Sequence, residues 1–291
     1  MTSFSLVERK NIKRIDRNFL KKVITQRLLD SHKGNYGRLL LIGGTYPYGG
    51  AIIMAALAAV NSGSGLVTVA TDRENIAALH AHLPEAMAFD VMEKDLLTEQ
   101  IQKADIILIG PGLNDNAKGQ AIFRQVWEQV QAHQVLIVDG GAISLLTRLR
   151  LDLPAAQLVF TPHQKEWERL SGLALAEQTE DNTKQAVERF PLGTIIVQKR
   201  NGTRIWQTGQ EDCYQLDVGG PYQATGGMGD TLAGMIASFA GQFPQVSLYE
   251  RVVAATYLHS AIAEELSQTA YVVLPTSISR EIPKTMKEIS K

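Results

Sequence analysis

The feature that most constrains the fold of this chain is a series of short, almost continuously apolar runs. They are RLLLI at 38–42, LVTVA at 66–70, IILI at 106–109, VLIV at 135–138, LVF at 158–160 and TIIV at 194–197. Strands buried on both faces have this composition, because helices cover a parallel sheet above and below. Helical patterns alternate with the runs, at 52–61, 75–82, 118–132 and 165–171. The alternation predicts an α/β fold with a mainly parallel central sheet and helices on both of its faces.

The last third of the chain has a different pattern. Two β-rich segments, 203–206 and 213–216, flank a polar turn and predict an antiparallel hairpin. Long helical patterns follow at 230–242 and 248–267. Since no Gly/Pro/Ser-rich linker divides the chain, we predict a single domain over residues 31–282. The first thirty residues are predicted to form a helical arm, and residues 283–291 a C-terminal tail.

Charge and composition exclude several classes of protein. The chain has 29 Lys and Arg against 30 Asp and Glu, so it lacks the basic excess typical of nucleic-acid binders. Its single cysteine forms no internal disulfide. The longest apolar stretch, 51–60, is far shorter than the roughly 20 residues that span a bilayer, and residues 1–22 contain no apolar core of a signal peptide. We therefore expect a cytoplasmic protein that binds neither nucleic acid nor a membrane.

The strongest local motif is ATGGMGD at 224–230, at the start of a predicted helix. Gly226, Gly227 and Gly229 let the backbone approach a ligand with no Cβ in the way. The N–H groups at the start of a helix favour an anion. We interpret the motif as a site for phosphoryl transfer or elimination, in which backbone N–H groups hold negative charge and Asp230 takes a hydroxyl proton. The alternative is a glycine-rich turn with Asp230 as an ordinary helix N-cap.

Four predicted strands end in small or polar residues. These segments are GGTYPYGGA at 43–51, GPG at 110–112, DGG at 139–141 and TPH at 161–163. Open α/β sheets bind ligands at the carboxyl ends of their strands, so the segments are expected to line one rim. The first of them matches neither a Walker loop nor a dinucleotide fingerprint, and a structural turn is its alternative.

The segment KRNGT at 199–203 has two interpretations. Asn-Gly is a hairpin-turn dipeptide, and the functional alternative is contact with the phosphate or ribose of a nucleotide through the backbone and Lys199.

His163, with Glu166 one turn further on, is either a binding residue or a helix cap. Asp105, Asp139 and Glu166 are candidate magnesium ligands, whereas the absence of CxxC and HExxH motifs argues against zinc.

Taken together, these segments resemble the ribokinase-like superfamily, and more closely the ADP/ATP-dependent NAD(P)H-hydrate dehydratase family. The resemblance runs from HKGNYG at 32–37 to the helix that ends near Ser267. Its most specific pieces are GRLLLIGGTYPYGGA at 37–51, SGSGLVTVAT at 62–71, PEAM at 84–87, GPGL at 110–113, TPHQKE at 161–166 and ATGGMGDTLAG at 224–234. It implies a single-domain ribokinase-like fold in a homo-oligomer, often a tetramer, without a fused epimerase domain.

The resemblance also implies an activity and the residues that carry it. The activity is ADP- or ATP-dependent dehydration of the S-epimer of NADHX or NADPHX, with Mg²⁺, which restores NADH or NADPH. Asp230 would be the general base, and Gly226, Gly227 and Gly229 would hold the transferred phosphate. Four residues would contact the hydrate substrate, namely Ala51, Gly112, His163 and Asp230. Six would contact the adenine nucleotide, namely Lys199, Arg200, Asn201, Gly202, Thr203 and Gly229.

Two departures from the family pattern affect substrate preference. Met228 replaces the usual small residue of the GTGD motif, which puts a larger side chain beside the anion site. The segment DGGA at 139–142 replaces a DADA-like segment, so that Asp139 alone matches. Two other functions use the same motifs. They are a small-molecule kinase, acting on a vitamin precursor or a sugar, and a non-catalytic nucleotide-binding protein.

Overall fold

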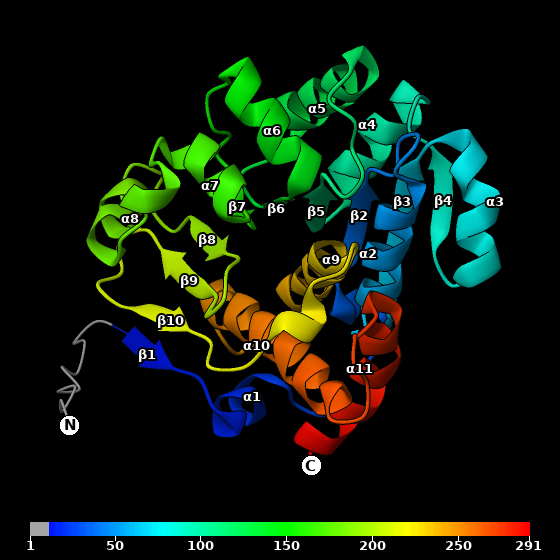
Figure 1. The fold of residues 1–291 in the computed structure, drawn as a ribbon. Coiled ribbons are helices and arrows are strands. Elements are labelled where there is room, and N and C mark those ends of the chain that lie inside the picture. The colour runs from blue at the N-terminus through cyan, green and yellow to red at the C-terminus, as the bar shows by residue number, and fades with distance from the viewer. Residues whose placement is uncertain (1–11) are drawn as a thin grey trace, which may run out of the picture.

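The computed structural model describes residues 12–291, and in that range ten strands form one sheet (Figure 1). The strands are β1 (Ile12–Arg14), β2 (Arg38–Ile42), β3 (Leu66–Thr71), β4 (Met87–Asp90), β5 (Ile106–Ile109), β6 (Val135–Val138), β7 (Gln157–Phe160), β8 (Ile195–Gln198), β9 (Arg204–Gln207) and β10 (Cys213–Gln215). Their order across the sheet is β1-β10-β9-β8-β7-β6-β5-β2-β3-β4.

The sheet is mainly parallel, as predicted. In the part of the sheet ordered β8-β7-β6-β5-β2-β3-β4, each adjacent pair of strands is parallel. Only β9 runs antiparallel, to both β8 and β10, and the β9–β10 pair is the predicted hairpin. Because β8 also turns back directly into β9, the segment at 199–203 is itself a hairpin connection.

Helices cover both faces of the sheet. They are α1 (Arg17–Val23), α2 (Gly49–Asn61), α3 (Arg73–His82), α4 (Lys94–Lys103), α5 (Ala117–Gln129), α6 (Gly140–Leu149), α7 (Gln164–Ser171), α8 (Glu180–Val187), α9 (Met228–Ala240), α10 (Leu248–Ser267) and α11 (Pro275–Ile289). In Figure 1, α4 to α7 lie on one side of the sheet, and α2, α9, α10 and α11 on the other.

Two apolar clusters make up the core, one on each face of the sheet. Successive residues of a strand point to opposite faces. Leu39 and Leu41 accordingly belong to the cluster under α2, α9 and α10, whereas Leu40 and Ile42 belong to the one under α4, α5 and α6. This arrangement is the physical reason for the unbroken apolar runs, because every residue of β5 and β6, and every residue of β2 after Arg38, is buried.

The structure corrects the predictions for both ends of the chain. Residues 283–291 are not a tail, because α11 continues through Pro283 to Ile289. Ile278, Ile282 and Ile289 of this helix are buried against the core, and this packing holds the helix despite the internal proline. The described part of the N-terminal arm contains α1 but also β1, which pairs in parallel with β10; residues 1–11 of the arm lie outside the described range.

The edge strand β4 is one of the elements that sequence periodicity missed. Met87, its first residue, is exposed, Phe89 is its one buried residue, and it ends in Asp90, so it lacks the fully buried apolar run of the central strands. It forms through backbone pairing with β3. None of the helices between residues 12 and 291 is long and apolar enough to cross a membrane.

Candidate active site

The loops that follow the central strands pack tightly against one another at the carboxyl edge of the sheet. The Gly44 N–H donates to the Pro111 carbonyl over 2.9 Å, and the Thr45 N–H donates to the Gly112 carbonyl over 2.9 Å. Gly110 has a φ of +128°, and a Cβ added there would lie 1.8 Å from the carbonyl oxygen of Asp139. The loops after β2, β5 and β6 therefore form one rim, as the sequence predicted.

The glycine-rich motif leads into α9 and leaves the first turn of that helix open. Gly227 occupies the N-cap position with a φ of 92°, and no side chain caps the helix. The first N–H groups of a helix have no acceptor within it, so they form an anion site. Asp230 lies inside the first turn and not at the cap. The interpretation of Asp230 as an ordinary N-cap is therefore wrong.

A buried ion pair lies beside this helix start. The Lys199 ammonium donates to Asp139 Oδ1 over 2.8 Å, and the hydroxyl of Thr161 donates to the same oxygen over 2.5 Å. The Lys199 side chain is 20% exposed and that of Asp139 4% exposed. A Cβ added to Gly229 would lie 3.2 Å from Lys199 Nζ, so this lysine reaches the first turn of α9.

The surroundings of Asp230 change its acidity. Burial raises the pKa of its carboxyl from 3.8 to about 7, with further increases from the negative charges of Asp139 and Glu166 and an opposing effect from Lys199. Burial by itself lowers the pKa of Lys199, but Asp139, Glu166 and Asp230 outweigh it, so that its pKa is raised. Lys199 is thus a permanent cation beside a carboxyl that exchanges its proton near neutral pH, which suits a general base.

His163 is a helix cap, the second of its two predicted roles. Its Nδ1 accepts the N–H groups of Lys165 and Glu166 at the start of α7, and Glu166 in return accepts the N–H of His163 over 2.8 Å. His163 also pairs with Lys199 through an isolated parallel bridge, which joins the ends of β7 and β8. The segment 199–203 therefore lies on the same rim as the other strand ends, which the sequence did not indicate.

A cavity of about 590 Å³ opens beside this pair. It is lined by His163, Lys199, Arg200, Asn201, Gly202, Thr203, Val218, Gly219, Gly220, Pro221, Gln223, Ala224, Met228, Gly229, Leu232, Thr256, His259 and Ser260. All six residues predicted to contact the nucleotide line it. Met228 lines it too, but it also packs against the core, so its larger side chain is partly accommodated there.

The predicted substrate residues Ala51 and Gly112 meet outside this cavity. A Cβ added to Gly112 would lie 3.0 Å from the Ala51 Cβ. Of the four predicted substrate residues, only His163 lines the cavity. The predicted site residues therefore fall into two groups: one lines the cavity, and the other, Ala51 and Gly112, lies at the start of α2. Asp230 lies in the first turn of α9, and Lys199 lies beside that turn.

Sequence reasoning missed two walls of the cavity. One is the loop 218–224, whose Gly-Gly-Pro at 219–221 was a usable turn signal. The other is a face of α10 formed by Thr256, His259 and Ser260. Their i, i+3, i+4 spacing places them on one face of a largely buried helix, and this pattern could have identified them. Burial lowers the pKa of His259 to about 4, so its imidazole is neutral.

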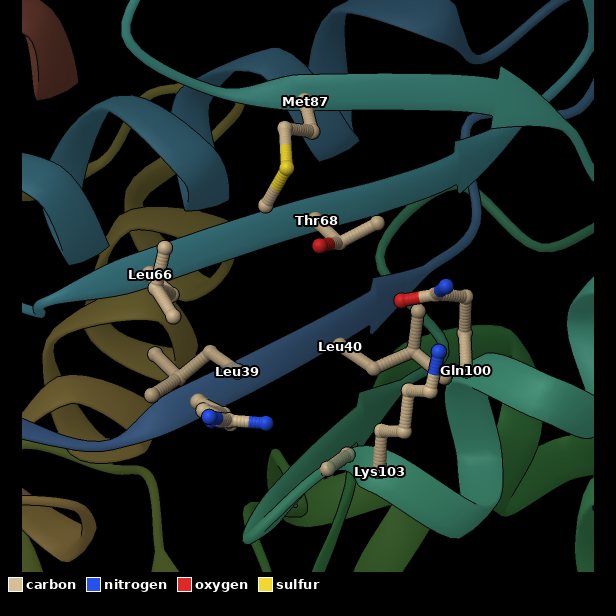
Figure 2. A pocket seen from close by; sticks show the side chains of 9 residues that line it. Leu39, Leu40, Leu66, Thr68, Met87, Gln100 and Lys103 are labelled. Carbon is tan, nitrogen blue, oxygen red and sulfur yellow. The ribbon is translucent and has the colours of Figure 1, made fainter. Parts of the chain in front are cut away.

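A second, smaller cavity of about 140 Å³ lies at the opposite, amino-terminal edge of the sheet. Figure 2 shows it over the starts of β2, β3 and β4, with Thr68 and Met87 on the strands and Gln100 and Lys103 on the neighbouring helix α4. No carboxylate lines it. Arg38 and Lys103 line it, but it lacks the carboxylate base that the proposed phosphoryl transfer needs.

The candidate magnesium ligands do not all lie together. Asp105 precedes β5 at the amino-terminal edge, where its carboxylate accepts the N–H of Arg38, so it is removed from the site. Asp139, Glu166 and Asp230 all act electrostatically on Lys199. Mg²⁺ is commonly held by one or two carboxylates together with substrate phosphates, and the two remaining candidates, Asp139 and Glu166, fit that pattern. Between residues 12 and 291 no group of three or more His, Cys, Asp or Glu forms a metal site of protein ligands alone.

Comparison with known proteins decides the family. A family model described as NAD(P)H-hydrate dehydratase matches residues 39–284. The chain belongs to this family. It is 65% identical over 278 residues to the ADP-dependent (S)-NAD(P)H-hydrate dehydratase of Streptococcus pneumoniae, with 96% of each chain covered.

Solved structures of the family share the fold. A ribokinase-like superfamily protein from Enterococcus faecalis superposes with a TM-score of 0.92 at 46% identity, covering 97% of each chain. The ADP/ATP-dependent NAD(P)H-hydrate dehydratase of Bacillus subtilis, co-crystallised with ATP and Mg²⁺, gives a TM-score of 0.79 at 26% identity, covering 94% of this chain and 97% of the other. The ribokinase-like fold implied by the motifs is confirmed.

Proposed function

We propose that this chain catalyses the ADP-dependent dehydration of (S)-NAD(P)H-hydrate and so restores NADH or NADPH. The observation that carries the proposal is Asp230, a carboxyl with a pKa of about 7 in the first turn of α9, next to the uncapped N–H groups of that helix. The family membership and the Streptococcus pneumoniae relative, named as this enzyme, support the same substrate and donor.

In the proposed reaction the hydroxyl of the hydrated nicotinamide ring attacks the terminal phosphoryl group of ADP, and AMP leaves. Asp230 takes the hydroxyl proton as the O–P bond forms. The phosphate then departs with cleavage of the C–O bond and loss of a neighbouring ring proton, which restores the double bond of the reduced nicotinamide.

Each group of residues has a role in this scheme. The backbone at Gly226, Gly227 and Gly229 holds the transferred phosphate, because N–H donors fixed before the reaction need no reorganisation when charge develops. Lys199, held by Asp139, adds a positive charge at the same position. Ala51, Gly112 and His163 position the hydrate, and the segment 199–203 binds the adenine nucleotide.

Magnesium belongs to the same proposal. Asp139 and Glu166 are the carboxylates that would hold the ion together with the nucleotide phosphates. When bound, Mg²⁺ neutralises phosphate charge and orients the phosphoryl group. A homotetramer and a cytoplasmic location stay predictions.

The test is recovery of absorbance at the reduced-nicotinamide band when the protein is mixed with Mg²⁺ and enzymatically hydrated NADH. ADP and ATP are supplied in parallel, with a control that lacks nucleotide. A rise that depends on ADP, with stoichiometric AMP and phosphate, is expected. A stable phosphorylated product without recovery of NADH would instead identify a small-molecule kinase.

A further inference from the structure

The turn after β2 leaves two tyrosines in solvent. Tyr46 is 84% exposed and Tyr48 is 56% exposed, on either side of Pro47. Single exposed apolar side chains are ordinary on a protein surface. Two aromatic residues in the six-residue connection 43–48, at the ligand-binding rim of the sheet, are a stronger indication of a binding role.

The backbone of this turn is fixed from several directions. The Tyr46 N–H donates to Asp72 Oδ2 over 2.9 Å, and the Tyr48 N–H donates to the Thr45 carbonyl over 2.7 Å. The Thr45 hydroxyl donates to the Gly112 carbonyl over 3.0 Å. Asp72 itself is buried and forms an ion pair with Lys118. A turn held in this way presents the two side chains from a pre-ordered backbone, which lowers the entropy lost when a ligand binds.

The turn also adjoins the predicted substrate residues. A Cβ added to Gly112 would lie 3.1 Å from the Tyr48 Cβ and 2.3 Å from the Tyr48 carbonyl oxygen. Gly112 has a φ of +64°, and a glycine there allows Tyr48 to approach this closely. Tyr48 is also the N-cap residue of α2, three residues before the helical Ala51.

We propose that Tyr46 and Tyr48 are substrate-binding residues that pack against a ring of the dinucleotide hydrate, a role that rests on the proposed function. Aromatic side chains contribute large contact area and stack on planar rings. The dinucleotide hydrate offers two ring surfaces for such contact, the planar adenine and the partly saturated ring derived from nicotinamide. A phenol ring already ordered at the rim contacts either one without a change in the backbone.

Steady-state kinetics of single alanine and phenylalanine variants at both positions test the proposal. Tyr46→Ala and Tyr48→Ala are each expected to raise KM for (S)-NADHX about two- to tenfold, with kcat and the KM for ADP unchanged. The phenylalanine variants keep the ring and are expected to retain the KM of the wild type. Tyr271→Ala, at a fully exposed tyrosine outside the turn and outside both cavities, is the matched control.

A binding experiment separates this proposal from the proposed function. NADH and reduced nicotinamide mononucleotide are titrated by their fluorescence, with AMP present to fill the nucleotide cavity. Weaker binding of both probes to Tyr48→Ala supports contact with the nicotinamide ring, and weaker binding of NADH alone supports contact with adenine. Unchanged binding and unchanged KM in both alanine variants overturn the proposal. A wild type that binds NADH through these tyrosines but shows no dehydration overturns the proposed function alone.

Discussion

Replacing Asp230 by asparagine should abolish activity and at the same time stabilise the fold. The folded protein raises the pKa of this carboxyl from 3.8 to about 7, mainly by burial. A raised pKa means that the folded state binds a proton more tightly than the unfolded state does. Ionised Asp230 therefore destabilises the fold, and this destabilisation grows as the pH rises from about 4 to about 7.

The magnitude follows from the size of that difference. Each pKa unit corresponds to about 1.4 kcal/mol, so the ionised carboxyl lowers the free energy of unfolding by on the order of 4 kcal/mol at pH 8. At pH 5 the folded carboxyl is still protonated whereas the unfolded one is largely ionised, and the same linkage gives roughly 2 kcal/mol. Asparagine has the shape of the protonated acid and no charge. Asp230→Asn should thus be more stable than the wild type by about these amounts.

Urea unfolding at pH 8 and pH 5 measures the effect, alongside NADH recovery. The loss of a general base should reduce turnover by about 10²- to 10⁴-fold. Glu250→Gln is a control of opposite sign, because hydrogen bonds from Lys22 and Ser247 outweigh burial and lower the pKa of Glu250, so this variant should lose stability at pH 8. An Asp230→Asn protein that is no more stable than the wild type at pH 8, or whose advantage is equal at both pH values, would refute the reasoning.

Three further outcomes are expected. In the wild type kcat/KM should rise about tenfold per pH unit below pH 7 and level off above it, because only ionised Asp230 accepts the proton; a pH-independent profile would contradict its role. Lys199→Met leaves Asp139 buried without its cation and should cost about 3 kcal/mol in urea unfolding, partly recovered by adding Asp139→Asn; equal stability of all three proteins would argue against the ion pair. Gly227→Ala forces a side chain into a φ of 92° and should cost about 1–2 kcal/mol and most of the activity, and calorimetric titration with ADP would show whether the anion site is lost.

The sequence by itself determined the layered fold and the strand-end segments that form one rim of the sheet. Unbroken apolar runs specify strands buried on both faces, and such strands require helices above and below. Gly43, Gly110, Gly112 and Gly141 at strand ends marked the rim, because close backbone packing there leaves no room for a Cβ. The motif at 224–230 marked the start of α9. These signals are local, so they can be recognised in the sequence without knowledge of the tertiary structure.

Only the tertiary structure decided which of these segments meet and what their charges do. The hairpin turn at 199–203 reaches the rim because β8 pairs beside β7, and its Lys199 meets Asp139, which is 60 residues away in sequence. The pKa of Asp230 depends on burial and on neighbours brought in by three other strands and loops, and no linear spacing encodes these. The contribution of α10 to the cavity wall and the helical conformation of the C-terminus also depend on contacts between residues that are far apart in the sequence. Long-range packing, and not local propensity, supplies the free energy that holds them in place.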